Sequence, residues 1–385
     1  MKFCLLILTI LAVVVNGNTK ANVLQFENLG YSGTYNPVLE LKNIDSDSCT
    51  CVLGDPVAFN GTAAPLNEQL SVHFRGPLIL HKFAAYYSPN FITNNDNSDS
   101  WNRIAYYDDS QGTADNVTFL TNAGANSSCL GNGLSYAGSD GISKASSATI
   151  LGENTLIHSN EEFVIFSNLS CGSSSLQGDC GVYRPNIPAF KGYDGTVKMF
   201  LFEFEMPQEN NGNEDIINYN SPAIWLLNAQ IPRTSQYSMN SNCSCWASGC
   251  GEFDIFEIMN NTYSTELLTT IHDYQGTDNI NTGIIIPGYI ERNFNSVMKG
   301  GVIFDNSGNA VVFMSNSTTF NNTITAATAN GWISKAGNVV NDALSSVSYV
   351  PPKSSSKSKG DAGQIDKSFM SQITLGIFSL IFWLT

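Results

Sequence analysis

The sequence predicts an all-β protein. Aromatic residues make up 11% of the 385 residues, and 32 glycines are spread along the chain, a composition that suits short strands joined by turns. No long stretch shows the periodicity of an amphipathic helix or of a heptad repeat. A chain of this length can hold one large β domain and a small module.

The chain changes character near residue 76. Residues 18–76 are turn-rich and contain the Cys49-Thr-Cys51 pair, which predicts a small disulfide-tied N-terminal module. Residues 77–343 contain longer apolar segments and predict the main β domain. Its strands are expected, in chain order, at residues 78–87, 101–107, 117–121, 161–166, 197–206, 222–228, 250–259 and 267–276, followed by a hairpin at 301–314.

The segment 197–206 has a two-sided pattern. Alternation places Phe200, Phe202 and Phe204 on one face of a strand and Glu203 on the other. We therefore expect a half-buried strand that packs through its Phe face.

Three carboxylates lie on the predicted strand at 250–259. Glu252, Asp254 and Glu257 are interspersed with large apolar residues in a chain where only 13% of residues are charged. Burying an acid has a desolvation cost and no packing benefit, so acids kept in such a strand are candidates for chemistry. The alternative is a chance acidic strand with one solvated face, which the apolar neighbours Phe253 and Phe256 disfavour.

The spacing of these acids predicts a β-bulge. On a regular strand Glu252 and Asp254 share one face, and Glu257 falls on the other. One bulge between Asp254 and Glu257 would return Glu257 to the face of the other two, so that all three line one cleft. A glycosidase that retains anomeric configuration needs two carboxyl groups about 5–5.5 Å apart. A third acid between them would hydrogen-bond the nucleophile and help hold the two pKa values apart.

The Glu-x-Asp-x-x-Glu pattern at 252–257 resembles the catalytic strand of glycoside hydrolase family 16. A Pro-Ala-x-Trp-Leu strand at 222–228 precedes it, as a similar strand does in that family. Little folded sequence remains between Glu257 and the linker near residue 345, and this chain position indicates a circularly permuted sandwich.

Over about residues 26–332, the chain resembles the fungal GPI-anchored cell-wall family described as circularly permuted β-1,3-glucanases. The resemblance is carried by three stretches, at 31–35, 71–77 and 245–254. It implies a concanavalin-like jelly-roll β-sandwich, circularly permuted, and endo-β-1,3-glucanase activity in cell-wall remodelling.

Within that resemblance, Glu252 would attack the anomeric carbon, Glu257 would protonate the leaving oxygen and then activate water, and Asp254 would orient Glu252. The partner would be a β-glucan polysaccharide, and no metal ion or organic cofactor is needed. There are two alternatives to a hydrolase: the first uses the same residues, and the second uses only the same sandwich fold. One is a transglycosylase that crosslinks wall glucan or chitin, and the other is a non-catalytic carbohydrate-binding wall glycoprotein.

Three further residues are candidates for substrate contact. Trp225 and Trp246 could stack on sugar C–H faces, and both could equally be core residues, Trp225 more so because its run is apolar. His272 follows the acidic strand, where the related family often carries a cleft histidine. A packed, hydrogen-bonded imidazole is the alternative for His272.

Both ends of the chain predict a secreted, surface-anchored protein. Residues 1–17 have the layout of a secretory signal peptide. Residues 344–360 form a Ser/Lys-rich linker, and residues 361–385 predict a GPI-attachment signal that is removed, with Gly360 as the attachment residue. We therefore expect the protein in the cell wall and at the cell membrane, held by a GPI lipid anchor.

Cysteines and sequons agree with secretion. Eight cysteines follow the signal peptide, which permits four disulfides; Cys171 and Cys180 are close enough to close a local loop. A cluster of Cys243, Cys245 and Cys250 predicts a disulfide staple rather than a zinc site. The net charge of −15 argues against nucleic acid as a partner. Expected glycosylation sites are Asn60, Asn116, Asn126, Asn168, Asn242, Asn260, Asn316 and Asn321.

Overall fold

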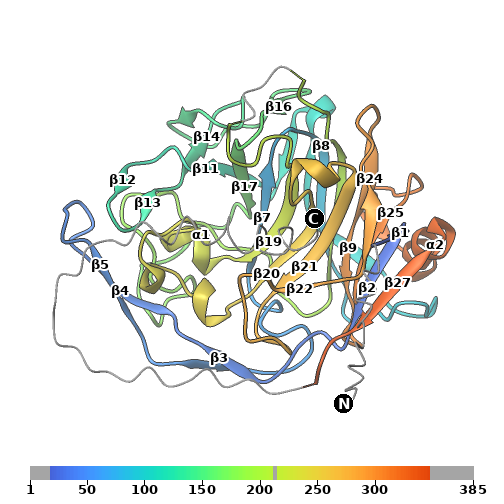
Figure 1. Ribbon diagram of the computed structural model, residues 1–385, viewed down its shortest axis with the longest axis horizontal. Coiled ribbons are helices and arrows are strands. Elements are labelled where there is room, and N and C mark those ends of the chain that lie inside the picture. Colours follow the sequence, from blue (N-terminus) through green and yellow to red (C-terminus); the bar gives the residue numbers. More distant parts are fainter. Residues whose placement is uncertain (1–17, 211–214, 347–385) are drawn as a thin grey trace, which may run out of the picture. The chain divides into compact units, whose positions relative to one another are not determined.

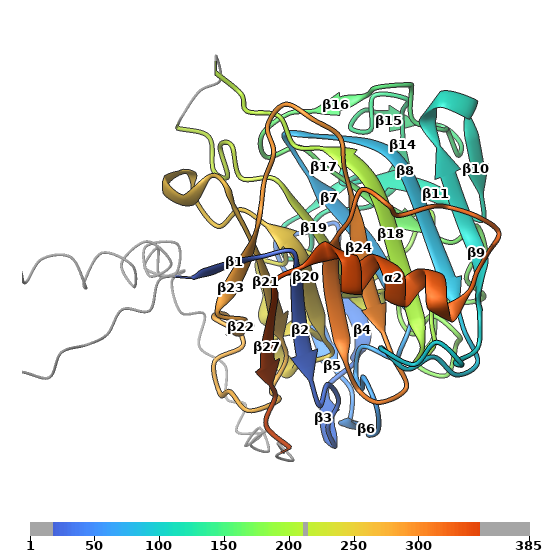
Figure 2. The ribbon, with the colours of Figure 1, turned by 90° about the vertical axis from the view of Figure 1, so that its right-hand side faces the viewer.

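Two large β-sheets make up most of the structure. The computed structural model describes residues 18–210 and 215–346. An 11-stranded and a 10-stranded sheet enclose a hydrophobic core between them (Figures 1 and 2). This arrangement confirms the predicted all-β sandwich. The expected signal peptide, the GPI-attachment signal, Gly360 and most of the linker lie outside the described residues.

The first sheet contains the strand with the three acids, β20, near its middle. Its central strands, from β23 to β14, pair antiparallel, whereas β1 pairs parallel with β23. In spatial order its strands are β1 (Thr19–Ala21), β23 (Gly288–Glu291), β21 (Glu266–His272), β20 (Glu252–Glu257), β19 (Ala223–Asn228), β7 (Leu70–Arg75), β17 (Glu162–Phe166), β11 (Thr118–Thr121), β14 (Ser135–Ala137) and β15 (Lys144–Ala145), with β22 (Ile284–Ile285) beside β21.

The second sheet joins strands from both ends of the described chain. In spatial order they are β10 (Thr113–Asp115), β9 (Trp101–Asp108), β8 (Leu78–Tyr87), β18 (Lys198–Glu205), β24 (Met298–Phe304), β25 (Ala310–Met314), β2 (Val23–Glu27) and β27 (Val339–Ala343), with β16 (Leu156–Ile157) beside β8 and β26 (Thr323–Ile324) beside β9. Strand β2 pairs with both β25 and β27 (Figure 1). Adjacent chain ends are the geometry that a circular permutation requires.

Small strand pairs and short helices complete the chain. The pairs are β3 (Gly33–Tyr35) with β6 (Val57–Phe59), β4 (Val38–Lys42) with β5 (Thr50–Leu53), and β12 (Asn126–Ser127) with β13 (Gly131–Asn132). The helices are α1 (Gln230–Thr234), α2 (Ala326–Ala336) and the single turns η1 (Asp109–Gln111), η2 (Ser241–Cys243), η3 (Trp246–Ser248) and η4 (Asn261–Tyr263). The predicted boundary at residue 76 stays a prediction; β1, β2 and β7 precede it and pair within the two large sheets.

The core confirms the predicted Phe face of β18. Phe200, Phe202 and Phe204 are fully buried between the sheets, where Phe204 stacks on Phe256 of β20 at 5.5 Å. Burying one such side chain contributes about 1.5–3 kcal/mol, so these rings hold the second sheet firmly against the strand with the acids.

Helix α2 covers the outer face of the second sheet, as Figure 2 shows. It begins after Thr325, whose side chain accepts a hydrogen bond from the backbone N–H of Thr328. Trp332 packs against Phe313 of β25 at 6.0 Å. The sequence pattern did not predict this helix. Among the described residues no helix has the length and apolar character to cross a membrane.

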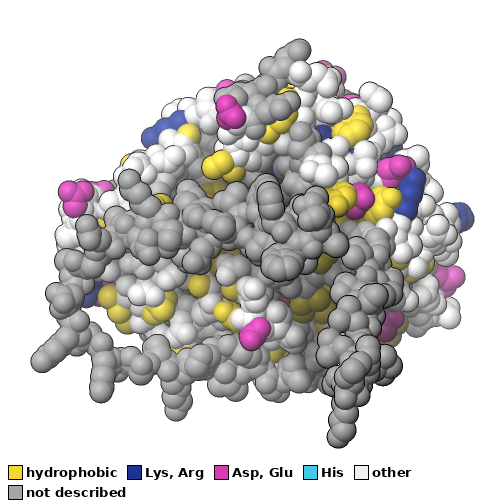
Figure 3. Space-filling view, in the orientation of Figure 1, with side chains coloured by type: hydrophobic (Ala, Val, Ile, Leu, Met, Phe, Trp, Pro, Cys, Tyr) yellow, Lys and Arg dark blue, Asp and Glu magenta, His cyan; other side chains and the backbone are white. Residues whose placement is uncertain are grey.

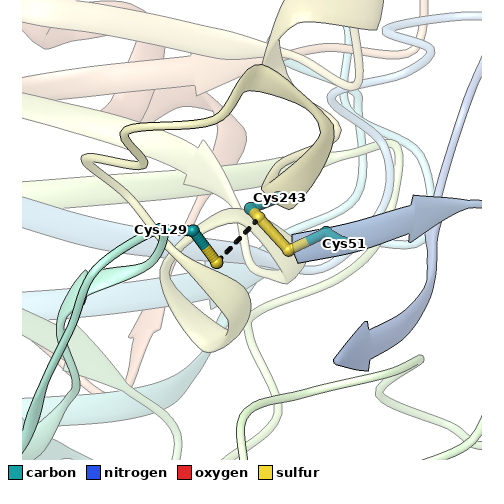
Figure 4. Close-up of side chains that lie close together, drawn as sticks. All are labelled: Cys51, Cys129 and Cys243. Carbon is teal, nitrogen blue, oxygen red and sulfur yellow. Dashed lines mark hydrogen bonds between the residues drawn. A yellow bond between two sulfur atoms is a disulfide. The ribbon is translucent and has the colours of Figure 1, made fainter. Parts of the chain in front are cut away.

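Four disulfides are formed among the described cysteines. Cys171–Cys180 closes the predicted local loop, and Cys245–Cys250 closes the loop that leads into β20. Two further bonds are Cys49–Cys129 and Cys51–Cys243, with sequence separations of 80 and 192 residues. Figure 4 shows the Cys51–Cys243 disulfide with the sulfur of Cys129 beside it; the Cys243 and Cys129 sulfurs are 3.7 Å apart. Together they tie the β4–β5 hairpin to the loops around Cys129 and η2. The sulfurs of Cys51, Cys129 and Cys243 lie close together, but each is part of a disulfide, so none of the three is a thiolate that could bind a metal ion.

Gly301 provides a test of the central packing of the second sheet. A Cβ at Gly301 would lie 1.9 Å from the carbonyl oxygen of Phe200, whereas one at Gly331 in α2 would meet no atom within 4 Å. We predict that Gly301→Ala lowers the free energy of unfolding by about 1–3 kcal/mol. The control Gly331→Ala should raise it by about 0.5–1 kcal/mol. Urea titration followed by circular dichroism measures both, and equal effects would contradict this account of the sheet.

Candidate functional site

A β-bulge at Ile255 places the three acids on one face of the first sheet. Between Asp254 and Glu257 the register shifts: these two residues lie opposite Thr270 and Leu268, only two positions apart on β21. On the other side, adjacent residues of β19 face Phe256 and Asp254. The predicted bulge is therefore confirmed. Phe253, Ile255, Phe256 and Ile258 are fully buried in the core.

The register of the strands arranges this sheet face into three rows. One row runs from Glu162 through Arg75 and Ala223 to Glu257. The next contains Val164, His73, Trp225, Asp254 and Thr270. The third contains Ser71, Leu227, Glu252 and His272. Each predicted acid thus has its own set of neighbours on the adjoining strands.

Glu252 lies at the Cys245–Cys250 end of the site. Its side chain is half-buried, and one carboxylate oxygen accepts a hydrogen bond from the indole Nε1 of Trp246. Trp246 belongs to η3, the turn inside the loop closed by Cys245–Cys250. The disulfide therefore holds the indole against the carboxylate, and the ring of Trp246 lies 6.1 Å from that of His272.

Asp254 and His272 form the centre of the site. Asp254 is buried, and its Oδ2 lies 3.0 Å from Nε2 of His272. Nδ1 of His272 donates to the carbonyl oxygen of Ile280 at 2.6 Å, since a carbonyl can only accept. Burial opposes the imidazolium charge, but the hydrogen bond to Asp254 and the charges of Asp254 and Glu252 raise the pKa of His272 to about 10. A charged imidazolium therefore lies beside two of the three carboxylates.

Glu257 is paired with an arginine that was not predicted. Nη2 of Arg75 lies 3.0 Å from Oε1 of Glu257, and the two side chains are 12% and 18% exposed. Nε of Arg75 donates to the carbonyl oxygen of Ser221 at 2.8 Å, which fixes the guanidinium over β19. Residue 75 lies in the 71–77 stretch that carried the family resemblance, and alternation along that strand would have placed Ser71, His73 and Arg75 on one face.

The two outer carboxyls hold protons more tightly than ordinary glutamates. Burial raises the pKa of Glu252 and of Glu257, and the charge of Asp254 raises both further. The neighbouring cations act in the other direction, His272 on both carboxyls and Arg75 on Glu257. Because the two groups interact, their protons belong to the pair, and one carboxyl can stay protonated while the other is ionised.

Trp225 lies in the row of Asp254 but is only 5% exposed. Its ring stacks on the imidazole of His73 at 5.1 Å. Burial lowers the pKa of His73 to about 3, so this imidazole is neutral, and its Nε2 lies 2.9 Å from the hydroxyl of Ser71. These contacts place Trp225 in the packed floor of the site, whereas Trp246 and His272 are more accessible.

Two cavities lie outside this cluster of acids. One of about 310 Å³ adjoins His81 on the second sheet, and one of about 540 Å³ adjoins Glu68 and Asn228 near the end of β19. Glu68 is not a solvated surface residue: it is half-buried and accepts hydrogen bonds from Tyr35 at 3.0 Å and Asn228 at 2.8 Å. On the face drawn in Figure 3, charged side chains are few and scattered among uncharged ones.

The expected glycosylation sites differ in accessibility. Asn116 is half-buried, and its Nδ2 donates to the carbonyl oxygen of Ile104 at 2.9 Å, so the nitrogen that would carry a glycan is already bonded. The other seven sites are exposed: Asn60, Asn126, Asn168, Asn242, Asn260, Asn316 and Asn321.

The fold and the site define a two-sheet β-sandwich that carries three carboxylates, an imidazolium and a guanidinium on one sheet face. A family model described as "Cell wall protein YJL171C/Tos1, C-terminal" matches residues 99–332, and its N-terminal counterpart matches residues 22–88. The chain belongs to this YJL171C/Tos1 family of cell wall proteins.

Its relatives share a common name. The chain is 56% identical over 377 residues to "Probable circularly permuted 1,3-beta-glucanase PGA52" of Candida albicans, with 98% of each chain covered. It is 52% identical to YJL171C of Saccharomyces cerevisiae, which has the same description, over 91% of this chain and 90% of that one. Identity to TOS1 of the same yeast is 32%, over 81% and 90% of the two chains. No solved structure matches the chain.

The charge of His272 makes a prediction about stability. Because its pKa is raised from 6.5 to about 10, its contribution is fully present below pH 6.5 and is lost as pH rises toward 10. At pH 6, His272→Gln should lower the free energy of unfolding by about 2 kcal/mol, since an uncharged amide replaces the charged partner of Asp254. The difference from the unsubstituted protein should shrink as urea titrations are repeated up to pH 10. A difference independent of pH would contradict a charged His272.

Proposed function

We propose that this protein is a retaining glycosidase, an endo-acting β-1,3-glucanase of the cell wall. The observation that carries the proposal is the bulge at Ile255, which brings Glu252, Asp254 and Glu257 onto one sheet face. The relatives' description as 1,3-beta-glucanases supplies the substrate, a β-1,3-linked glucan.

In the first step Glu252 acts as the nucleophile. Its carboxylate oxygen bonds to the anomeric carbon while the bond from that carbon to the leaving oxygen breaks. The hydrogen bond from Trp246 and the nearby imidazolium of His272 favour the ionised form that attack requires. The indole of Trp246 also orients the carboxylate of Glu252, because it donates a hydrogen bond to one of its oxygens.

Glu257 acts first as an acid and then as a base. Its proton passes to the leaving oxygen during attack by Glu252, and the ionised Glu257 then takes a proton from the water that attacks the glycosyl-enzyme. The residues of β19 opposite Glu252 and Glu257 are Leu227 and Ala223, four positions apart. This spacing is about 13 Å along a strand. The two side chains must therefore lean toward each other to reach the carboxyl separation of about 5–5.5 Å found in retaining enzymes.

Asp254 positions the other groups rather than reacting. It holds the imidazolium of His272 at 3.0 Å and lies between the two reacting carboxyls on β20. Its charge raises the pKa of both Glu252 and Glu257, which favours a proton on one of the two carboxyls before the first step. At the end of the cycle the Glu252 carboxylate is restored and the glucan chain has been hydrolysed.

Attachment to the cell surface is a separate part of the proposal. We propose that the mature protein is secreted and held in the cell wall and at the membrane by a GPI anchor on Gly360. The support is the C-terminal sequence pattern together with membership of a cell wall protein family.

We predict that Glu252→Gln and Glu257→Gln each reduce the release of reducing sugar from laminarin at least about 100-fold, because each removes one reacting carboxyl. The matched control is Glu203→Gln, a half-buried acid paired with Lys299 at 3.2 Å on the second sheet. The control should keep its activity. Unchanged turnover in either of the first two variants would rule out the assignment.

For the anchor, we predict that Gly360→Leu reduces the fraction of protein released from cells by a phosphatidylinositol-specific phospholipase C, because attachment needs a small residue. The control is Ser354→Leu in the linker, which should be released like the unsubstituted protein. Release of Gly360→Leu at the control level would contradict Gly360 as the attachment residue.

A further inference from the structure

A row of alternating charges crosses four strands of the first sheet and ends at Glu257. Glu162 of β17 lies directly opposite Arg75 of β7, and Arg75 lies opposite Ala223 of β19, which in turn lies opposite Glu257 of β20. The small side chain of Ala223 leaves room for the guanidinium to pass over β19 and reach Glu257 at 3.0 Å. Directly opposed residues on paired strands have Cβ atoms about 4.5–5.5 Å apart, so Glu162 and Arg75 are close neighbours.

Glu162 is held as a hydrogen-bond acceptor. The Tyr237 hydroxyl lies 2.8 Å from both carboxylate oxygens of Glu162. The same hydroxyl accepts a hydrogen bond from Nε2 of Gln236 at 2.9 Å. Its single proton is therefore directed at Glu162. Burial raises the pKa of Glu162, and the Tyr237 hydroxyl and the Arg75 charge act in the opposite direction and favour the ionised carboxylate.

These contacts determine the charge that surrounds Glu257. With Glu162 ionised and Arg75 charged, the row is neutral when Glu257 carries a proton and has a net charge of −1 when it does not. Without Glu162, Arg75 would be an unbalanced cation 3.0 Å from Glu257 and would favour its ionised form. A general acid must instead carry a proton before the glycosidic bond breaks.

We propose that Glu162, held by Tyr237, is the counter-ion of Arg75 that allows Glu257 to carry its proton in the first step, and that Arg75 then stabilises the Glu257 carboxylate left in the glycosyl-enzyme. Glu162, Tyr237 and Arg75 are thus positioning residues that act through Glu257. The inference rests on the proposed function for the role of Glu257, whereas the charge coupling within the row does not depend on it.

The proton and electron count of the cycle agrees with this role. In the first step the Glu257 proton goes to the leaving oxygen, and Glu252 becomes an uncharged ester. That step removes one negative charge from Glu252 and creates one on Glu257, beside Arg75. In the second step water gives one proton to Glu257 and its hydroxyl group to the anomeric carbon, while the bond from that carbon to Glu252 breaks and Glu252 leaves as a carboxylate.

Other charged groups also face Glu257. Asp254 and Glu252 lie on the same strand, and His272 lies on β21, where the residue directly opposite Glu257 is the apolar Leu268. None of these groups changes in the variants below. The contributions of Glu162 and Arg75 can therefore be measured against a constant background.

The experiment uses two substitutions with opposite expected signs. Glu162→Gln removes the counter-ion and should lower the Glu257 pKa by about one unit, whereas Arg75→Gln removes the cation and should raise it. Titration of the 13C-labelled glutamate carboxyls by NMR, with the Glu257 signal assigned from Glu257→Gln, measures both shifts without any substrate. Tyr237→Phe should also lower the pKa of Glu257, but by less than Glu162→Gln does. Glu203→Gln is the control that should leave it unchanged.

A kinetic measurement then tests the role in catalysis. In Glu162→Gln the alkaline limb of kcat/KM on laminarin should move to lower pH, with a loss of about 10-fold at the pH of the original limb. A dinitrophenyl oligoglucoside, whose leaving group needs no protonation, should be cleaved by Glu162→Gln nearly as fast as by the unsubstituted protein. A merely structural role would reduce both reactions equally.

The outcomes separate the inference from the proposed function. A Glu257 pKa that stays constant, or that moves in the same direction in Glu162→Gln and Arg75→Gln, would overturn the counter-ion role whatever the activity. An equal loss on both substrates would overturn it as well. An unsubstituted protein that cleaves no glucan would instead contradict the proposed function, and opposite shifts by NMR would still support the charge coupling in the row.

Discussion

The site depends on one extra residue in β20. The bulge at Ile255 keeps Phe253, Ile255, Phe256 and Ile258 in the core and still returns Glu257 to the face of Glu252 and Asp254. With regular alternation, Phe256 would lie on the face of Glu252 and Asp254, and Glu257 would point into the core. Packing of Phe256 against Phe204 of the second sheet fixes the position of the bulge, so the sandwich core and the site share a single constraint.

Three acids on a half-buried face need compensating charge, and the neighbouring strands supply it. His272 comes from β21 and Arg75 from β7, while the Trp246 indole comes from the loop closed by Cys245–Cys250. An acid that is buried without such partners would have a large desolvation cost. The order of strands in the sheet therefore affects the protonation of the three carboxyls as much as the sequence of β20 does.

Local pattern was sufficient to predict part of this arrangement. The spacing of Glu252, Asp254 and Glu257 predicted the bulge, because the side-chain period of a strand is two and an odd offset must be corrected. The alternation of Phe200, Phe202 and Phe204 predicted the core face of β18 for the same reason.

Long-range pairing could not be predicted in this way. Arg75 meets Glu257 across 182 positions of sequence because β7 lies next to β19, and Cys51 joins Cys243 across 192. Either partner alone has an ordinary sequence context. Helix α2 was missed because Trp332 and Ile333 are its only large apolar side chains, too few to show a helical period, and because it is stabilised by the face of the second sheet that it covers.

Trapping the glycosyl-enzyme tests directly whether Glu252 is the nucleophile. The protein is incubated with a 2-deoxy-2-fluoro laminari-oligoside that carries an activated leaving group, digested with a protease and analysed by mass spectrometry. We predict a single glycosylated peptide with the label on Glu252. A label on Glu257 or on another acid, or turnover of glucan with inversion of the anomeric configuration, would contradict it.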